Sequence, residues 1–270
     1  MYLQKTKRPM ALLLCGAFAL ASGAALTADD AAAEKKGLAI AREADRRDLG
    51  WKDSTADMQM ILRNRSGQES RREMRARNLE VKNDGDKSLV VFDRPRDVKG
   101  TAFLTYSRRS GPDDQWLYLP SLKRVKRIAS NNKSGPFMGS EFAYEDISSQ
   151  EVEKYSYKFL REEDLNGVKT NVVARYPVDR SSGYKRQLVW IDQDEYRIRQ
   201  IVFYDRKNAK LKTLSYESYR QYLGKYWRAL ELRMLNHQSG KSTVLSFANY
   251  KFRTGLRVRD FDQASLKRIR

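Results

Sequence analysis

Residues 153–176 read EKYSYKFLREEDLNGVKTNVVARY, and this stretch decides the class of fold. Two segments rich in β-branched and aromatic residues, 153–161 and 168–176, flank the dipeptide Asn166-Gly167. Both residues of that pair tolerate a positive φ, so Asn-Gly is typical of the two-residue turn of a β-hairpin. The stretch therefore predicts two antiparallel strands joined by a tight turn.

The same alternation with period two extends over most of the chain. It begins near residue 55 with Met58, Met60 and Leu62, and turn clusters such as Asn83-Asp84-Gly85 separate the segments. Further strands are expected at 87–93, 101–107, 115–119, 123–128, 185–192, 197–205, 210–220, 226–236 and 242–253. About a dozen strands exceed the usual size of an open sheet, so the sheet must curl or close. We predict a mainly β fold, with a single curved antiparallel sheet that forms a half-open β-barrel.

One helix is expected before the strands. Residues 31–47 are dominated by Ala, Glu, Lys and Arg, which favour helix, and Leu38, Ala41 and Ala44 form a modest apolar stripe. This N-terminal helix is available to cover one face of the sheet.

Residues 129–150 break the strand pattern and predict a long loop. Turn-forming residues fill its first half, yet it carries Phe137, Met138, Phe142 and Tyr144. A loop of this length in a compact domain usually has a function. Two interpretations stay open: a lid whose aromatic side chains cover a cavity, or a loop that packs its own aromatics onto the end of the barrel.

The first residues of the chain predict a signal peptide. Lys5, Lys7 and Arg8 precede an apolar run, and small residues follow up to Ala28. This arrangement is typical of secretory signals, and the run is too short for a good membrane span. We expect residues 1–28 to be the signal peptide, residues 29–270 to form a single domain, and the mature protein to lie in the periplasm. A lipoprotein site at Cys15 is the alternative.

The composition excludes most catalytic chemistry. The chain has 270 residues with one Cys and one His, so disulfide frameworks, Cys-based zinc sites and His-rich metal sites are excluded. The histidine, His237, enters a turn and is expected to be solvated. We predict no enzyme activity, no cofactor and no metal. Carboxylates such as Glu141, Glu145 and Asp146 leave an unrecognised hydrolase as a third, weaker hypothesis.

The charge of the chain is strongly positive. Lys and Arg number 53 against 34 Asp and Glu, a net charge of +19. In an exported protein nucleic acid is not the expected partner, and anionic lipid headgroups or an acidic protein surface are the candidates. Alternatively, the charges only solvate the outside of the barrel. The densest cluster is predicted to dock on a membrane or partner: Lys123, Arg124, Lys126 and Arg127.

Several stretches together resemble the LolA-like family of outer-membrane lipoprotein-sorting proteins. They are Phe92-Asp93-Arg94-Pro95, residues 99–104, 114–128 and 135–146, and then Trp190-Ile191-Asp192, Tyr204-Asp205 and Lys212-Thr213. The resemblance implies a half-open barrel over an apolar concavity that binds acyl chains in the periplasm, without catalysis or cofactor. It also implies that the protein acts together with an exporter of the resistance-nodulation-division (RND/MMPL) type or with an outer-membrane acceptor. The Gly-Pro-Phe-Met-Gly-Ser loop departs from the well-studied carriers, so the cargo is open between a lipoprotein and another lipid.

The leading hypothesis is therefore a monomeric periplasmic carrier of lipid or lipoprotein acyl chains. The runner-up is a non-catalytic adaptor of an envelope export complex, with a barrel filled by its own side chains. For the carrier, the residues expected to line or cover the cavity are Phe92, Phe103, Trp116, Tyr118, Phe137, Met138, Phe142 and Trp190.

Overall fold

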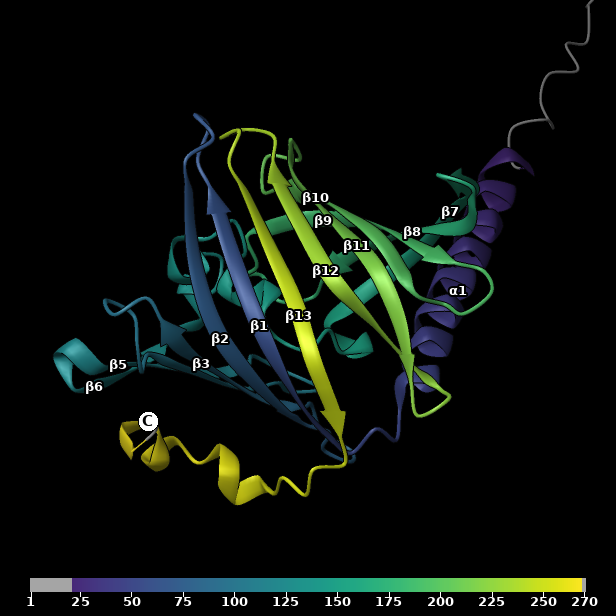
Figure 1. Cartoon of the computed structure of the whole chain (residues 1–270). Coiled ribbons are helices and arrows are strands. Elements are labelled where there is room, and N and C mark those ends of the chain that lie inside the picture. The colour runs from purple at the N-terminus through teal and green to yellow at the C-terminus, as the bar shows by residue number, and fades with distance from the viewer. Residues whose placement is uncertain (1–20, 269–270) are drawn as a thin grey trace, which may run out of the picture.

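The computed structural model describes residues 21–268 (Figure 1). One helix, α1 (Ala21–Asp48), precedes the strands, so the helix expected at 31–47 is confirmed and begins earlier. The proposed signal peptide falls largely on residues 1–20, outside the described residues, and the remainder of it belongs to α1. Among the described residues, no helix is both long and apolar enough to cross a membrane.

Thirteen strands follow α1. They are β1 (Asp53–Arg63), β2 (Glu69–Leu79), β3 (Lys87–Arg94), β4 (Ala102–Tyr106), β5 (Asp114–Leu119), β6 (Arg124–Ile128), β7 (Tyr155–Leu165), β8 (Val168–Pro177), β9 (Tyr184–Asp192), β10 (Ile198–Asp205), β11 (Lys210–Tyr222), β12 (Tyr226–Asn236) and β13 (Ser242–Phe252). Short 3₁₀ turns lie at Pro120–Leu122, Ser130–Asn132, Phe137–Gly139, Tyr144–Asp146, Val152–Lys154, Val258–Phe261 and Gln263–Arg268.

The predicted hairpin is confirmed at β7 and β8. Leu165 pairs with Val168 across the turn, and Asn166 and Gly167 adopt φ values of 54° and 82°. Strand β2 was not expected from the sequence. Its outward positions carry charged side chains, and only Met74 and Ala76 are buried, so apolar alternation is too sparse to detect.

All strands belong to one antiparallel sheet in the order β6-β5-β4-β3-β2-β1-β13-β12-β11-β10-β9-β8-β7. The pairing of β1 with β13 joins the two halves of the chain, and the sheet curves without closing (Figure 1). The two edge strands, β6 and β7, are consecutive in the sequence. Residues 129–154, here called the crossing loop, must therefore bridge the opening between the edges.

The main core lies on the face of the sheet that carries the crossing loop and α1, which we call the inner face. Every strand contributes to it. One row of directly paired residues runs across five strands, from Val173 through Val189, Ile201 and Leu214 to Met234. Burial of this row on every strand favours the curvature, because the residues of a curved sheet converge on its concave side.

The opposite, outer face carries two smaller apolar clusters. The C-terminal segment places Phe261 and Leu266 against β3, β4 and β5, where both side chains are fully buried. A second outer cluster on β8, β9 and β10 includes Trp190. Apolar residues at both parities of these strands, seen in the sequence, therefore correspond to strands covered on both faces.

Helix α1 lies directly on the edge strand β7. A Cβ atom at Gly37 would stand 2.7 Å from the backbone nitrogen of Phe159 and 2.8 Å from the carbonyl carbon of Lys158. Ile40, one turn further along, is buried in the main core. Only glycine permits this contact between helix and strand backbone.

Replacing Gly37 by alanine tests this contact. Intrinsic helix propensity favours alanine over glycine by about 1 kcal/mol. Overpacking against the β7 backbone typically costs about 1–3 kcal/mol and opposes that gain. We expect Gly37→Ala to lower the free energy of unfolding in urea. Ala39→Gly, at an exposed position of the same helix, serves as the control for propensity and costs about 0.5–1 kcal/mol. A Gly37→Ala variant more stable than the parent would contradict the close approach.

Candidate ligand cavity

A buried ion pair holds the crossing loop against the inner face. Lys212 Nζ on β11 lies 2.6 Å from Asp146 Oδ2 in the loop, and the two side chains are 5% and 4% exposed. Tyr184 OH and the backbone nitrogen of Ala143 also donate to Asp146, and Lys212 donates to the carbonyl of Glu141 at 2.9 Å. Both charges are thus paired and hydrogen-bonded, which buried charges require.

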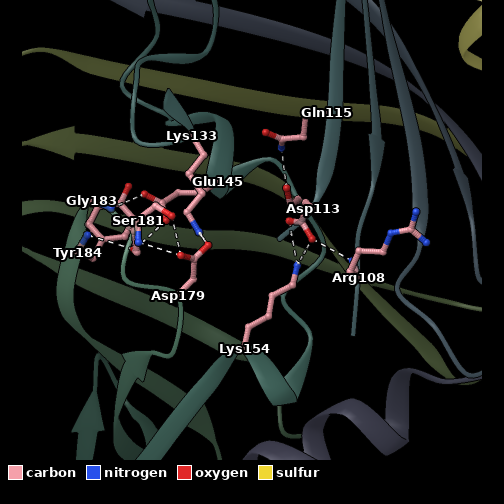
Figure 2. Close-up of polar contacts among 12 residues, drawn as sticks. Arg108, Asp113, Gln115, Lys133, Glu145, Lys154, Asp179, Ser181, Gly183 and Tyr184 are labelled. Atoms are coloured by element: carbon pink, nitrogen blue, oxygen red, sulfur yellow. Dashed lines mark hydrogen bonds and ion pairs between the residues drawn. The ribbon is translucent and has the colours of Figure 1, made fainter. Parts of the chain in front are cut away.

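Further polar contacts tie the crossing loop to both sides of the opening (Figure 2). On one side Gln115 of β5 donates to the carbonyl of Tyr144 at 2.9 Å, and Lys154 contacts Asp113 at 2.8 Å. On the other side Glu145 accepts from the backbone nitrogen of Gly183 at 2.9 Å. Burial raises the pKa of the Glu145 carboxyl, and this hydrogen bond opposes the rise. The crossing loop, residues 129–154, is therefore fixed between the two halves of the sheet, and we call it the strap.

The aromatic side chains of the strap fill one half of the inner face. Phe137 and Phe142 are 1% and 2% exposed. The Phe137 ring centroid lies 5.0 Å from that of Phe103 and 6.1 Å from that of Phe92. Met138 packs on the same core and is half-buried. The structure thus brings these five predicted residues together as packed core, which corresponds to the second interpretation of the loop rather than to a lid.

Three other predicted cavity residues lie elsewhere. Trp116 and Tyr118 belong to the outer cluster beneath the C-terminal segment, and Trp190 belongs to the outer cluster of β8–β10. Trp190 Nε1 donates to Glu163 at 3.1 Å. Alternation explains the placement, since Leu117 and Val189, next to them in sequence, point inward. The expectation that these three residues line a cavity is corrected by their position on the outer face.

A cavity of about 1380 Å³ lies beside the strap, between the C-terminal half of α1 and the inner face. It reaches the surface at residues such as the exposed Arg46 and Leu49. Its apolar and aromatic walls include Ala41, Ala44, Tyr157, Val173, Val189, Ile191, Ile198 and Tyr216. None of the eight residues predicted for a cavity is among its lining residues. Those eight residues were chosen for their aromatic or apolar side chains, whereas α1 contributes to this cavity two alanines, Ala41 and Ala44, and four charged residues.

Several carboxylates also line the cavity. They are Asp45, Asp48, Asp53, Glu80, Asp84, Asp86, Glu151 and Glu195. Burial raises the pKa of the Asp48 carboxyl, and burial together with Glu151, Glu80 and Asp48 raises the pKa of Asp86 to about 7. Glu151 Oε1 is buried without a hydrogen-bond partner among the described residues. The cavity therefore carries both acidic and basic side chains beside its apolar walls.

The predicted docking residues lie at the β6 edge of the sheet and are exposed. Lys123 occupies the turn before the strand with a φ of 49°. Arg124 and Lys126 share one face, since they pair with Leu119 and Leu117, and Arg127 pairs with Trp116 on the other. Arg127 also contacts Asp114 at 2.5 Å. The cluster is thus split between two faces of an edge strand, because successive side chains of a strand alternate.

The other groups considered for chemistry are dispersed. His237 shares a hydrogen bond of 2.7 Å with Thr213, and burial lowers the pKa of its imidazole. Glu141 accepts from Asn236, and Glu145 and Asp146 anchor the strap. Among residues 21–268, no three His, Cys, Asp or Glu side chains are grouped so as to hold a metal ion.

Comparisons with known proteins agree with this architecture. A domain from Vibrio parahaemolyticus, described as an outer membrane lipoprotein-sorting protein domain, is 56% identical with a TM-score of 0.85, over 87% of this chain and 99% of that one. A DUF1329 family protein from Desulfovibrio piger is 30% identical with a TM-score of 0.82, over 87% and 99% of the two chains. A LolA superfamily protein from Nitrosomonas europaea, 24% identical with a TM-score of 0.68 over 84% and 98%, shares the fold.

A protein-family model described as that of an uncharacterized protein matches residues 84–268. No curated protein matches the chain significantly. The curved open sheet preceded by helix α1 has a LolA-like fold. The chain belongs to the DUF1329 family of outer-membrane lipoprotein-sorting-like proteins.

The half-buried Asp86 predicts a pH dependence of stability. Its pKa is raised from 3.8 to about 7, so the stability it contributes is complete below about pH 4 and is lost as the pH rises through 7. At pH 8 the uncharged Asp86→Asn variant should exceed the parent by about 1–3 kcal/mol, and the difference should vanish at pH 4.

Asp84→Asn is the matched control, two residues away. Hydrogen bonds lower the pKa of the Asp84 carboxyl, so this variant should lose stability at pH 8. Thermal unfolding followed by circular dichroism at both pH values measures each difference. An Asp86→Asn variant as stable as the parent at both pH 4 and pH 8 would show that the pKa of Asp86 is not raised.

Proposed function

We propose that this protein is a periplasmic carrier that binds the acyl chain of a lipid or lipoprotein in the cavity beneath α1. The observation that carries the proposal is the cavity itself, about 1380 Å³ with walls from α1 and from β7–β11. Small-molecule sites usually measure roughly 300–1,000 Å³, so this space is ample for an extended hydrocarbon chain. Membership of a family with a lipoprotein-sorting relative supports the same function.

The energy of such binding needs no catalytic group or cofactor. Each buried methylene contributes about 0.8 kcal/mol, so a chain of roughly 14–16 carbons gains about 11–13 kcal/mol before ordering costs. A bilayer buries the same methylenes for about the same gain, so transfer of the chain between membrane, carrier and acceptor is close to balanced, as exchange requires. The protein then acts as a monomeric carrier, with residues 29–270 as one cargo-binding domain after removal of the signal peptide.

A structural adaptor of an envelope export complex is the second candidate. The observation that favours it is the strap, whose Phe137 and Phe142 fill the half of the inner face near β3 and β4. An adaptor needs no empty space, however, and the small side chains of Ala41 and Ala44 leave one. Cargo binding distinguishes the two functions.

Filling the cavity from α1 tests the carrier function. Ala44 lines the cavity, so Ala44→Phe should weaken binding of the neutral fluorescent probe N-phenyl-1-naphthylamine at least about ten-fold, since the ring occupies the space of the ligand. Ala39 lies on the same helix but is exposed and outside the cavity, and Ala39→Phe should leave binding unchanged. Equal binding by the parent and both variants, or no binding by the parent, would favour the filled-barrel adaptor.

The basic residues at the β6 edge are proposed to bring the carrier to its donor or acceptor. That partner is an anionic membrane surface or an acidic face of an RND/MMPL-type exporter or outer-membrane acceptor. Each basic residue near an anionic bilayer contributes about 1 kcal/mol. Changing Lys123, Arg124, Lys126 and Arg127 to Gln should reduce co-sedimentation with phosphatidylglycerol vesicles at low salt, and binding of the parent should decline as salt increases.

A matched control uses basic residues remote from this edge. Replacing Lys207, Lys210, Arg220 and Lys241 by Gln removes the same charge from other exposed positions. If both quadruple variants bind vesicles equally, net charge alone governs the attraction, and the docking role of the β6 edge is wrong.

A further inference from the structure

The inner wall of the cavity contains a buried arginine, Arg175, on strand β8. Its side chain lines the cavity, and the residue is only 6% exposed. Nε donates to Gln187 Oε1 at 2.7 Å, and Nη2 donates to Gln150 Oε1 at 3.2 Å. The guanidinium carbon lies 4.4 Å from the ring centroid of Tyr155, within cation–π distance.

Arg175 differs from the other arginines that line the cavity. Each of those forms an ion pair: Arg46 and Arg47 with Glu43, Arg109 with Glu153, Arg197 with Asp192, and Arg228 with Asp48. Arg175 forms none with any residue in the part of the chain that the structure describes. It is also the most buried of the six, so its charge is the most costly to leave without a counter-ion.

A second buried cation lies in the same row of the inner face. The register links Arg175 to Gln187, Gln187 to Phe203 and Phe203 to Lys212. Lys212 is neutralised by Asp146 of the strap, whereas Gln150 of the strap offers Arg175 only a neutral amide oxygen. Of the two buried cations in this row, Lys212 has a carboxylate partner and Arg175 has none. Arg175 is the one that lines the cavity.

Arg175 retains donors for a ligand. A guanidinium has five N–H groups, and the two hydrogen bonds above use Nε and one N–H of Nη2. Nη1 has no hydrogen-bond partner among residues 21–268. It is also not among the side-chain nitrogen and oxygen atoms that are fully buried without a partner, so it is accessible. Planar guanidinium groups bind carboxylate and phosphate oxygens through paired N–H donors.

Apolar walls adjoin this donor set. Val173 lies two residues before Arg175 on β8, and Val189 lies two residues after Gln187 on β9, so all four share the inner face. Tyr157 and Tyr216 also line the cavity. Burial raises the pKa of Tyr216 to about 12, and the Arg175 charge acts against this rise. The tyrosines therefore stay neutral and do not supply the missing anion.

We propose that Arg175 is the binding residue for the anionic end of the cargo, a carboxylate or phosphate carried by the acyl chain that lies along the apolar walls. This inference rests on the proposed carrier function and names its substrate class: acyl chains with an anionic head, as opposed to neutral ones. The other five arginines of the cavity are already paired with carboxylates, which leaves Arg175 as the arginine available to pair with such a head.

Competition among three ligands of equal chain length tests the proposal on the unmodified protein. Dodecanoate and dodecyl phosphate, each below its micelle concentration, and dodecanol, below its solubility limit, are titrated against bound N-phenyl-1-naphthylamine at pH 8. At least one of the two anionic ligands should bind ten-fold or more tightly than dodecanol, as measured by displacement of the probe. Ten-fold corresponds to about 1.4 kcal/mol. The stronger of the two identifies whether the head is a carboxylate or a phosphate.

Two variants assign the preference to Arg175. Arg175→Gln should bind all three ligands with the affinity of dodecanol, while dodecanol itself binds as it does to the parent. Arg109→Gln, at a half-exposed arginine of the same cavity, should keep the preference for the anionic ligands. If Arg175→Gln does not fold, Arg175→Lys retains the charge and should keep a reduced preference.

The outcomes separate this inference from the function on which it rests. If the parent binds the probe and the three ligands displace it equally, Arg175 is a structural residue and the inference is wrong, while the carrier function stands. An equal loss of preference in Arg109→Gln and Arg175→Gln would also overturn the assignment. If the parent binds neither the probe nor any of the three ligands, the carrier function itself is wrong.

Discussion

The buried ion pair between Lys212 and Asp146 is the interaction on which the rest of the structure depends. An open sheet whose edge strands β6 and β7 are consecutive in sequence requires a connection across its opening. The ion pair holds that connection on the inner face, where its aromatic residues become core. Removing one partner of a buried pair typically costs about 3–5 kcal/mol, because the other charge is left uncompensated. The strap is therefore fixed in place, and its position decides which part of the concavity is filled.

The other half of the concavity is shaped by α1. Gly37 lets the helix lie on the β7 backbone, and the alanines that follow leave space between helix and sheet. A filled half thus provides stability and an open half provides volume within the same curved sheet. The sequence suggested two alternatives, a barrel filled by its own side chains and a cavity for cargo. The structure has both, because the filled part lies near β3 and β4 and the cavity lies against β7–β11.

Much of the fold could be predicted from the sequence, whereas the cavity could not. Asn166-Gly167 and the alternation around it determine local geometry, and so the hairpin and most strands followed directly. Strand β2 was missed because its charged residues face solvent and conceal Met74. Trp116, Tyr118 and Trp190 were assigned to the wrong face because strands covered on both sides carry apolar residues at both parities. Arg175 gave no signal in sequence, since its significance arises only from the absence of a carboxylate in the folded neighbourhood.

Native mass spectrometry of the protein, released from the cell envelope without detergent, tests the central claim that the cavity beneath α1 holds an acyl chain. The account predicts one added mass per chain, removed by organic extraction and identified in the extract as an acyl lipid. Restoration of that mass by adding the extract back would complete the result. A spectrum showing only the mass of the polypeptide, both as isolated and after incubation with envelope lipids, would contradict the account.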